Sequence, residues 1–180
     1  MKKQYRRLLS LASLGFLGLM SGSVLADDVR FDGTLVADAC EVYPGDENIK
    51  LDFGTIVDNY IYLNTRTHSQ SFTIRLINCD LALGKEVQVT FTGTESKTLP
   101  GLLALDTVSQ AKGIAVGLET IDGEPIKINK VKDYLQALHK ENGNNLKLQA
   151  YIQGEPTALQ AKSIILGNFV ATSTFMLEYE

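Results

Sequence analysis

The sequence predicts an all-β domain and, within that class, an immunoglobulin-like β-sandwich. After residue 26 most of the chain alternates apolar and polar residues in short runs, which is the two-residue period of a strand. Gly, Asn, Asp and Pro residues separate the runs and predict turns. About seven short strands with a single pair of cysteines are typical of this sandwich. Because the chain has no Trp, the tryptophan-on-disulfide core of antibody domains is excluded.

The candidate strands follow one another along the whole chain after residue 26. The first places Val29, Phe31, Gly33 and Leu35 on one side, ahead of the first cysteine. The dipeptide Asp122-Gly123 predicts a two-residue hairpin between two later strands. The further candidate strands span residues 49–56, 71–78, 87–93, 113–121, 125–128, 146–154 and 167–180.

One segment departs from the strand pattern. Val131, Tyr134, Leu135 and Leu138 recur at helical spacing, which predicts a short helix or helical turn within residues 130–140. The run from Asn142 to Asn145 then predicts a turn or loop.

Length, composition and charge limit the function classes. The 180 residues, 44% hydrophobic and 21% charged, fit one globular domain rather than a disordered chain. The net charge of −4 argues against a nucleic-acid-binding surface, which normally carries a basic excess.

The N-terminus has the features of a secretory signal peptide over residues 1–26. A basic start precedes the apolar stretch 8–20, and Val24-Leu25-Ala26 has the small-residue pattern of a cleavage site. The alternative, a membrane anchor, needs a longer apolar run than the one before Asp27. Cleavage after Ala26 removes four positive charges and no acid, so the 154-residue product has a net charge of −8.

Export predicts a disulfide between Cys40 and Cys79, because an oxidising compartment allows the two cysteines to pair. The alternative is two free thiols. No C-x-x-C motif of a redox or zinc site is present.

The last candidate strand runs to the end of the chain. Its alternate positions from Gly167 to Tyr179 are mostly apolar, and no residues remain for a further strand beside it. A free edge of this kind needs cover. The candidate strand ahead of Cys40 could supply such a strand, so the two ends of the chain could be complementary between molecules.

These features resemble the pilin subunits of the chaperone–usher family. The resemblance rests on the Cys pair in the first half, Gly167 as the fourteenth residue from the end, penultimate Tyr179, and the terminal run FVATSTFMLEYE. It is strongest to minor subunits, in particular the adaptor between tip fibrillum and rod of P pili, on the segments DDVRFDGTLVADACEV, FTIRLINC and VTFTGTESKTLPG and on residues 150–180.

The resemblance implies a sandwich that lacks its final strand and is completed by donor-strand complementation. The periplasmic pilus chaperone first fills the groove with a strand of its own, and the N-terminal extension of a neighbouring pilus subunit later replaces it. The subunits are then secreted through an outer-membrane usher and form the fimbrium at the cell surface. The implied organisation is a signal peptide at 1–26, a donor-strand extension at 27–39 and a pilin domain at 40–180.

Individual residues acquire expected roles from the same resemblance. Gly33 matches the donor-strand glycine, whose missing side chain allows a close backbone approach. Glu180 supplies the C-terminal carboxylate that basic chaperone residues bind. The expected donor residues are Val29, Phe31, Gly33 and Leu35, and the expected acceptor-groove and chaperone-binding residues are Gly167, Phe169, Ala171, Phe175, Leu177, Tyr179 and Glu180.

Several alternatives remain open at this stage. The extension before Cys40 has only 13 residues, which suits a minor or adaptor subunit, and it could instead pair within its own sandwich. The minor subunit implied by the resemblance polymerises by donor-strand exchange and supports cell adhesion. A tip adhesin-type binding module, a rod subunit and an assembly terminator are the alternative fimbrial functions. Failure to accept any subunit's extension would distinguish a terminator.

Catalytic and cofactor motifs are missing from the sequence. His68 and His139 are the only histidines and lie in or beside predicted loops. No phosphate-binding glycine loop, nucleophile elbow or metal-ligand spacing occurs, so we expect no enzyme activity, cofactor, metal or small-molecule substrate.

Overall fold

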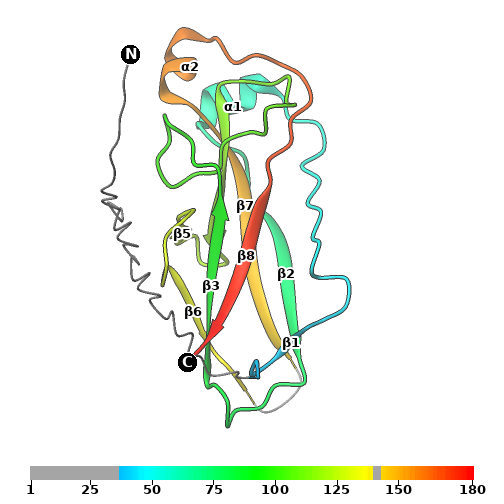
Figure 1. Cartoon of the computed structure of the whole chain (residues 1–180). Coiled ribbons are helices and arrows are strands. Elements are labelled where there is room, and N and C mark those ends of the chain that lie inside the picture. The colour runs from blue at the N-terminus through cyan, green and yellow to red at the C-terminus, as the bar shows by residue number, and fades with distance from the viewer. Residues whose placement is uncertain (1–36, 140–142) are drawn as a thin grey trace, which may run out of the picture. The chain divides into compact units, whose positions relative to one another are not determined.

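A computed structural model describes residues 37–139 and 143–180, which form two antiparallel β-sheets (Figure 1). The expected signal peptide and most of the expected donor segment, with Val29, Phe31, Gly33 and Leu35, lie outside the described residues. The larger sheet has the order β1 (Glu41–Val42), β2 (Gln70–Ile77), β7 (Asn144–Gly154), β4 (Ile114–Thr120) and β5 (Pro125–Ile126). The smaller sheet has the order β6 (Tyr134–Ala137), β3 (Glu86–Gly93) and β8 (Ser173–Tyr179).

The core lies between the two sheets and is built from the alternate residues of the strands. Ile74 of β2 and Leu148 of β7 are fully buried in the larger sheet, and Val89 of β3 is fully buried in the smaller one. Residues at the next positions along β2, such as Arg75, are exposed. The period-two pattern of the sequence therefore matches the inward and outward faces of these strands.

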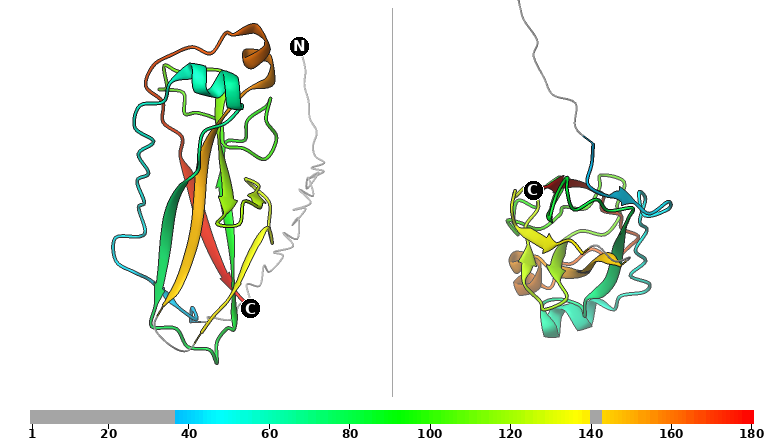
Figure 2. Two further views of the ribbon diagram at one scale, coloured as in Figure 1. Left: turned by 180° about the vertical axis from the view of Figure 1, so that it is seen from behind. Right: turned by 90° about the horizontal axis from the view of Figure 1, so that it is seen from below.

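Two short helices lie at one end of the sandwich, and the C-terminus lies at the other (Figures 1 and 2). Helix α1 (Asp58–Asn64) buries Ile61 and ends at Thr65, which has a φ of 66°. Helix α2 (Pro156–Ala161) begins with a proline, whose fixed φ suits a first helical turn, and ends at the left-handed Lys162. The alternation analysis had predicted neither helix.

Most of the predicted strands are confirmed to within about two residues at each end. The segments predicted at 71–78, 87–93, 113–121, 125–128 and 146–154 correspond to β2, β3, β4, β5 and β7. A hairpin at Asp122-Gly123 joins β4 to β5 as predicted, and Gly123 has a positive φ of 86°. Its connection is longer than the two residues predicted, because β4 ends at Thr120 and β5 begins at Pro125.

The predicted helix at 130–140 is wrong. Residues 131–133 form a turn, and Tyr134–Ala137 form β6, which pairs with β3 from Glu86 to Val89. Lys132 has a φ of 62°, which interrupts any helix at that point. Pairing with a strand far away in the sequence thus outweighs the local helical spacing.

Two other strand predictions need correction. Residues 49–56 alternate in burial but form no strand, because nothing in the described chain pairs with them. The terminal strand begins only at Ser173, because Gly167 has a φ of 144° and Asn168 and Val170 bond to a neighbouring loop. Their carbonyls accept hydrogen bonds from Gln110 and Asp106.

The predicted disulfide between Cys40 and Cys79 is confirmed. It joins the residue before β1 to the residue just beyond β2, so it ties the start of the domain to the larger sheet. Among the described residues, no helix is long and apolar enough to cross a membrane.

Candidate functional site

The last strand of the chain, β8, has only one partner. It pairs with β3 in antiparallel register, so that Phe175 lies opposite Phe91 and Tyr179 opposite Val87. Within residues 37–139 and 143–180, no strand pairs with its other edge. Phe175, Leu177 and Tyr179 face the core half-buried, and the residues between them are exposed. One edge of β8 is therefore free beside an apolar face.

A second segment lies opposite the free edge of β8. It consists of residues 47–57, between β1 and α1, which we call the facing wall. Ile49, Leu51 and Phe53 are half-buried and pack against the core, while the residues between them are exposed. Within the described parts of the chain, no backbone-to-backbone hydrogen bond links residues 47–56 to another segment. Along most of the facing wall, the backbone groups are therefore bound by no other described segment; the Gly54 N–H, which donates to the Asp52 side chain, is an exception.

An apolar groove of about 820 Å³ lies between the facing wall and β8. Its floor consists of buried side chains from both sheets and from the loop before β4, namely Phe72, Phe91, Leu103, Val116, Leu118 and Ala150. A second hollow of about 650 Å³ continues from it toward α1, with Ile61, Ala111 and Ile114 in its lining. Leu51, Phe53 and Phe169 line both hollows, so the two form one path along β8 and the segment before it.

The two sides of the groove touch at one pair of aromatic rings. Phe53 of the facing wall and Phe169 of the opposite side have ring centroids 6.3 Å apart, inclined at 41°. This is the distance range of favourable aromatic pairs. The pair divides the groove into a part beside β8 and a part beside the helices.

The predicted acceptor-groove residues take three kinds of position. Phe169, Ala171 and Phe175 line the larger hollow, and Gly167 lines the smaller one. Leu177 and Tyr179 lie beyond the hollows and pack against the core. The analysis of the sequence missed the facing wall as a lining element, although the half-burial of Ile49, Leu51 and Phe53 follows the alternation that was visible there.

The end of β8 is tied to the start of the domain. The Tyr179 hydroxyl donates a hydrogen bond to the Cys40 carbonyl, 3.2 Å away, and burial raises the pKa of this tyrosine. The Glu180 backbone N–H donates to the Glu86 carbonyl at 3.0 Å, and the Glu180 carbonyl accepts from Lys85 at 2.7 Å. The side chain of Glu180 is exposed and forms an ion pair with Lys132.

One ion pair holds the start of the facing wall. Arg75 of β2 binds both carboxylate oxygens of Asp46, from Nε at 2.8 Å and from a terminal nitrogen at 2.6 Å. The Arg75 backbone N–H also donates to Asp46, at 2.9 Å, and the guanidinium lies 3.9 Å above the ring of Tyr43. The hydrogen bonds from Arg75 lower the pKa of Asp46 to about 2 against the opposing effect of burial.

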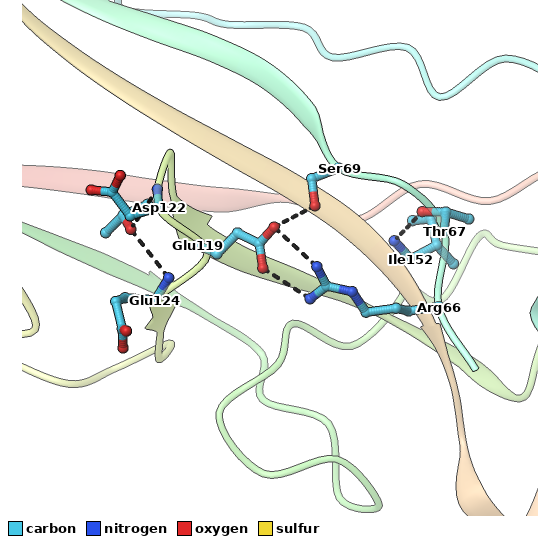
Figure 3. A network of polar contacts seen from close by, with 8 residues as sticks. Arg66, Thr67, Ser69, Glu119, Asp122, Glu124 and Ile152 are labelled. Atoms are coloured by element: carbon cyan, nitrogen blue, oxygen red, sulfur yellow. Dashed lines mark hydrogen bonds and ion pairs between the residues drawn. The ribbon is translucent and has the colours of Figure 1, made fainter. Parts of the chain in front are cut away.

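A similar arrangement stands on the outer face of the larger sheet (Figure 3). Arg66 binds the carboxylate of Glu119 at 2.9 and 3.2 Å and lies 4.0 Å above the ring of Tyr151, while Ser69 donates to the same carboxylate. Burial opposes ionisation of Glu119, but the hydrogen bonds from Arg66 and Ser69 outweigh it and lower its pKa. Because Glu119 alternates with the groove residue Leu118, this cluster points away from the groove.

The histidines and acids form no further site in the described chain. His68 accepts or donates a hydrogen bond of 2.8 Å with the Tyr60 hydroxyl at the surface. No group of three or more His, Cys, Asp or Glu side chains among residues 37–139 and 143–180 is arranged to hold a metal ion. The groove is thus the feature whose chemistry is distinctive, and it is shaped to take an extended strand with apolar side chains.

Comparison with known proteins agrees with this geometry. The family model described as "Fimbrial protein" matches residues 29–180. "Fimbrial adapter PapK" of Escherichia coli is 36% identical over 172 residues, which cover 93% of this chain and 96% of the relative. "Major MR/P fimbria protein" of Proteus mirabilis strain HI4320 is 33% identical over 171 residues, which cover 91% of this chain and 93% of the relative.

Solved structures share the fold. The crystal structure of the P pilus rod subunit PapA superposes with a TM-score of 0.65 at 18% identity, covering 79% of this chain and all of that one. A subunit in the structure of a chaperone–usher pilus superposes with a TM-score of 0.61 at 21% identity, covering 86% and 96%. The predicted all-β, immunoglobulin-like fold class is therefore confirmed.

Proposed function

The chain belongs to the fimbrial protein family, and we propose that within a chaperone–usher fimbria it is the adaptor between the tip fibrillum and the rod. Its function is that of a structural fimbrial subunit rather than an enzyme, and neighbouring subunits are its partners. Fimbriae are surface structures, so the subunit is located at the cell surface.

The free edge of β8 beside the apolar groove is the observation that carries the proposed mechanism. An added strand would pair with β8 on one side and with the facing wall on the other, and its alternate side chains would enter the groove. We infer that this strand is the N-terminal extension of a neighbouring subunit. Burial of apolar side chains would add about 25 cal/mol per Å² to the main-chain hydrogen bonds.

The chain also has a segment suited to being the donor. In this proposal residues 27–39 are the extension, residues 40–180 are the pilin domain and residues 1–26 are a cleaved signal peptide. Val29, Phe31 and Leu35 would enter the groove of the next subunit, and Gly33 would lie where the backbones approach closely. The disulfide at Cys40 fixes the point at which the extension leaves the domain.

Before assembly the groove needs a temporary occupant in the periplasm. We propose that a periplasmic chaperone donates a strand to it, and that an outer-membrane usher then receives the complex. The exposed end of the chain at Glu180 supports a role for its carboxylate as an anchor for basic chaperone residues. An anchor at the end of β8 would also fix the register of the donated strand.

The adaptor role rests on the similarity to the fimbrial adapter over nearly the whole chain. The short extension of 13 residues supports it. A rod subunit would polymerise with itself, and a terminator would accept no extension, so each alternative gives a different result in the experiment below.

The test is periplasmic expression with and without the cognate chaperone, followed by size-exclusion chromatography. We expect a stable one-to-one complex with the chaperone, and aggregation or degradation without it. A soluble monomer that ignores the chaperone would refute the incomplete-sandwich mechanism. Incubation of the complex with peptides matching subunit extensions then separates the roles, because a terminator captures none of them.

A further inference from the structure

We propose that Arg75 and Asp46 are positioning residues for strand capture: their ion pair, which we call the clamp, holds the facing wall at the distance from β8 that an inserted strand needs. The inference rests on the proposed function, because it concerns the groove that the donated strand would fill. Neither residue lines the groove. They act through the wall that begins next to Asp46.

The facing wall is held mainly at its two ends. In the part of the chain that the structure describes, residues 47–56 receive no backbone hydrogen bond from a neighbouring strand. At the far end the chain enters α1, where Ile61 is buried in the core. At the near end Asp46 is only 6% exposed, although the positions around it are exposed. Ile49, Leu51 and Phe53 pack the wall against the core, and the near end of its backbone depends on what holds Asp46.

Arg75 supplies almost everything that holds this end. Its backbone N–H, its Nε and a terminal nitrogen all donate to Asp46, at 2.9, 2.8 and 2.6 Å. Its carbonyl accepts from the Tyr43 N–H at 2.8 Å, and its guanidinium covers the Tyr43 ring. One residue of β2 thus holds both sides of the loop 43–46, and a planar guanidinium suits this bidentate contact better than a lysine would.

Fixing this loop has a direct effect on the groove. Ile49, Leu51 and Phe53 follow Asp46 within seven residues, and Phe53 reaches across to Phe169. A strand bound on both sides needs two edges at a defined separation, since hydrogen-bonded strands lie about 4.8 Å apart. A wall released from Arg75 would have to be ordered again during each binding event, which lowers the affinity and the rate of capture.

The chain offers a matched control in Arg66. Arg66 also binds a buried carboxylate through two nitrogens and also covers a tyrosine ring, and its side chain is exposed to a similar extent, 41% against 47% for Arg75. Its partner Glu119 lies on the outer face of the larger sheet, away from the groove (Figure 3). Removing either guanidinium leaves a buried carboxylate without its partner, so both changes weaken the fold by a comparable mechanism.

The experiment compares Arg75→Met, Arg66→Met and the wild type, each purified from the periplasm as its chaperone complex. The first readout is hydrogen exchange of residues 47–53 in that complex. The second is the rate at which a fluorescein-labelled peptide matching the N-terminal extension of a neighbouring subunit of the same fimbria is captured, followed by anisotropy. A third variant, Arg75→Lys, retains the charge but loses the two-pronged contact.

We expect Arg75→Met to raise exchange in residues 47–53 and to slow peptide capture by about tenfold, which corresponds to the loss of one strong interaction. Arg66→Met should match the wild type in both readouts, and Arg75→Lys should fall between. Equal exchange and equal capture in the two methionine variants would overturn the clamp. If the wild type captures no peptide, the proposed binding of that extension in the groove is refuted. The clamp is then tested by hydrogen exchange alone, and equal exchange of residues 47–53 in the two methionine variants would overturn it.

Discussion

The hydroxyl of Tyr179 bonds to the carbonyl of Cys40, so the penultimate residue of the chain is tied to the first residue of the disulfide-bonded domain. The free strand edge and the point where the proposed donor segment ends and the domain begins are therefore joined within one subunit. Between them lies Gly84, where an added Cβ would come within 2.9 Å of the Tyr179 Cβ. The close approach at Gly84 allows the tyrosine to reach Cys40.

Tyr179→Phe is expected to lower the free energy of unfolding of the strand-filled subunit by about 1 kcal/mol, because a hydrogen bond is lost and the Cys40 carbonyl loses its partner. Thermal unfolding of the chaperone complex measures the change. Tyr43→Phe serves as the control, since the exposed Tyr43 takes part through its ring rather than its hydroxyl. Equal losses in both variants would show that the Tyr179 bond contributes nothing specific.

The two faces of β8 should differ sharply in their tolerance of polar residues. Phe175 lines the groove, whereas Met176 is 47% exposed on the other face. Phe175→Asn removes apolar area worth about 2 kcal/mol at the strand interface, so we expect the chaperone complex to accumulate poorly. Met176→Asn should accumulate at the wild-type level. Immunoblots of periplasmic extracts compare the two, and similar levels of both would count against the groove as the chaperone site.

The strand content of the fold was predictable because most strands carry their burial pattern in the sequence. In β7 every second residue from Asn144 is buried, and in β2 the buried Ile74 and Leu76 flank the exposed Arg75, so the alternation gives the boundaries to within about two residues. Helices α1 and α2 were not predictable in this way, because seven and six residues are too few to establish a helical period. Their signals are local instead, such as Pro156 at the start of α2.

The candidate site was predictable on one side only. The resemblance to pilins implied an acceptor-groove role for Phe169 and Phe175, and both line the hollow beside β8, although strand binding there stays a prediction. The facing wall alternates equally well, but the sequence could not reveal that residues 49–56 lack a partner strand, since pairing depends on the positions of distant segments. The clamp between Asp46 and Arg75 was also hidden, because 29 residues separate its members.

The disulfide is expected to contribute a large part of the stability of the subunit. It closes a loop with a sequence separation of 39 residues, which corresponds to about 4 kcal/mol of stabilisation in the chain-entropy model. The double variant Cys40→Ser with Cys79→Ser should therefore unfold in far less denaturant than the wild type, measured by urea unfolding of the chaperone complex. An unchanged midpoint would show that the ordered β1 and β8 contacts alone hold this end of the domain.

The interaction between Asp46 and Arg75 should stop holding the facing wall below a defined pH. The pKa of Asp46 is lowered to about 2, below the ordinary value of an aspartate in an unfolded chain, by hydrogen bonds from Arg75. Its stabilising contribution is therefore fully present above about pH 4 and is lost as the pH falls toward 2. The other charged group close to this loop is Glu47, which accepts from the Gly45 N–H.

Hydrogen exchange of residues 47–53 in the chaperone complex, between pH 5 and pH 2, tests this limit after correction for the intrinsic pH dependence of exchange. We expect protection to persist to about pH 3 and to fall below it. Asp46→Asn should show low protection at every pH, with no acid transition. A transition near pH 4 in the wild type would mean that the carboxylate is not held by Arg75 in solution.

We expect Gly33 to be needed for donation of residues 27–39 to a neighbouring subunit but not for binding of the chaperone. If residues 27–39 enter the groove of a neighbour, Gly33 lies on the inward face with Phe31 and Leu35, and a branched side chain there would meet the neighbour's backbone. Gly33→Val is therefore expected to leave the chaperone complex at the wild-type level but to reduce fimbrial assembly at least about tenfold, the cost of a steric misfit of one or two kcal/mol. Thr34→Val, on the outward face, should assemble normally. Immunoblots of surface extracts for multimers that survive detergent measure assembly, and normal assembly of Gly33→Val would show that this segment does not enter a neighbour's groove.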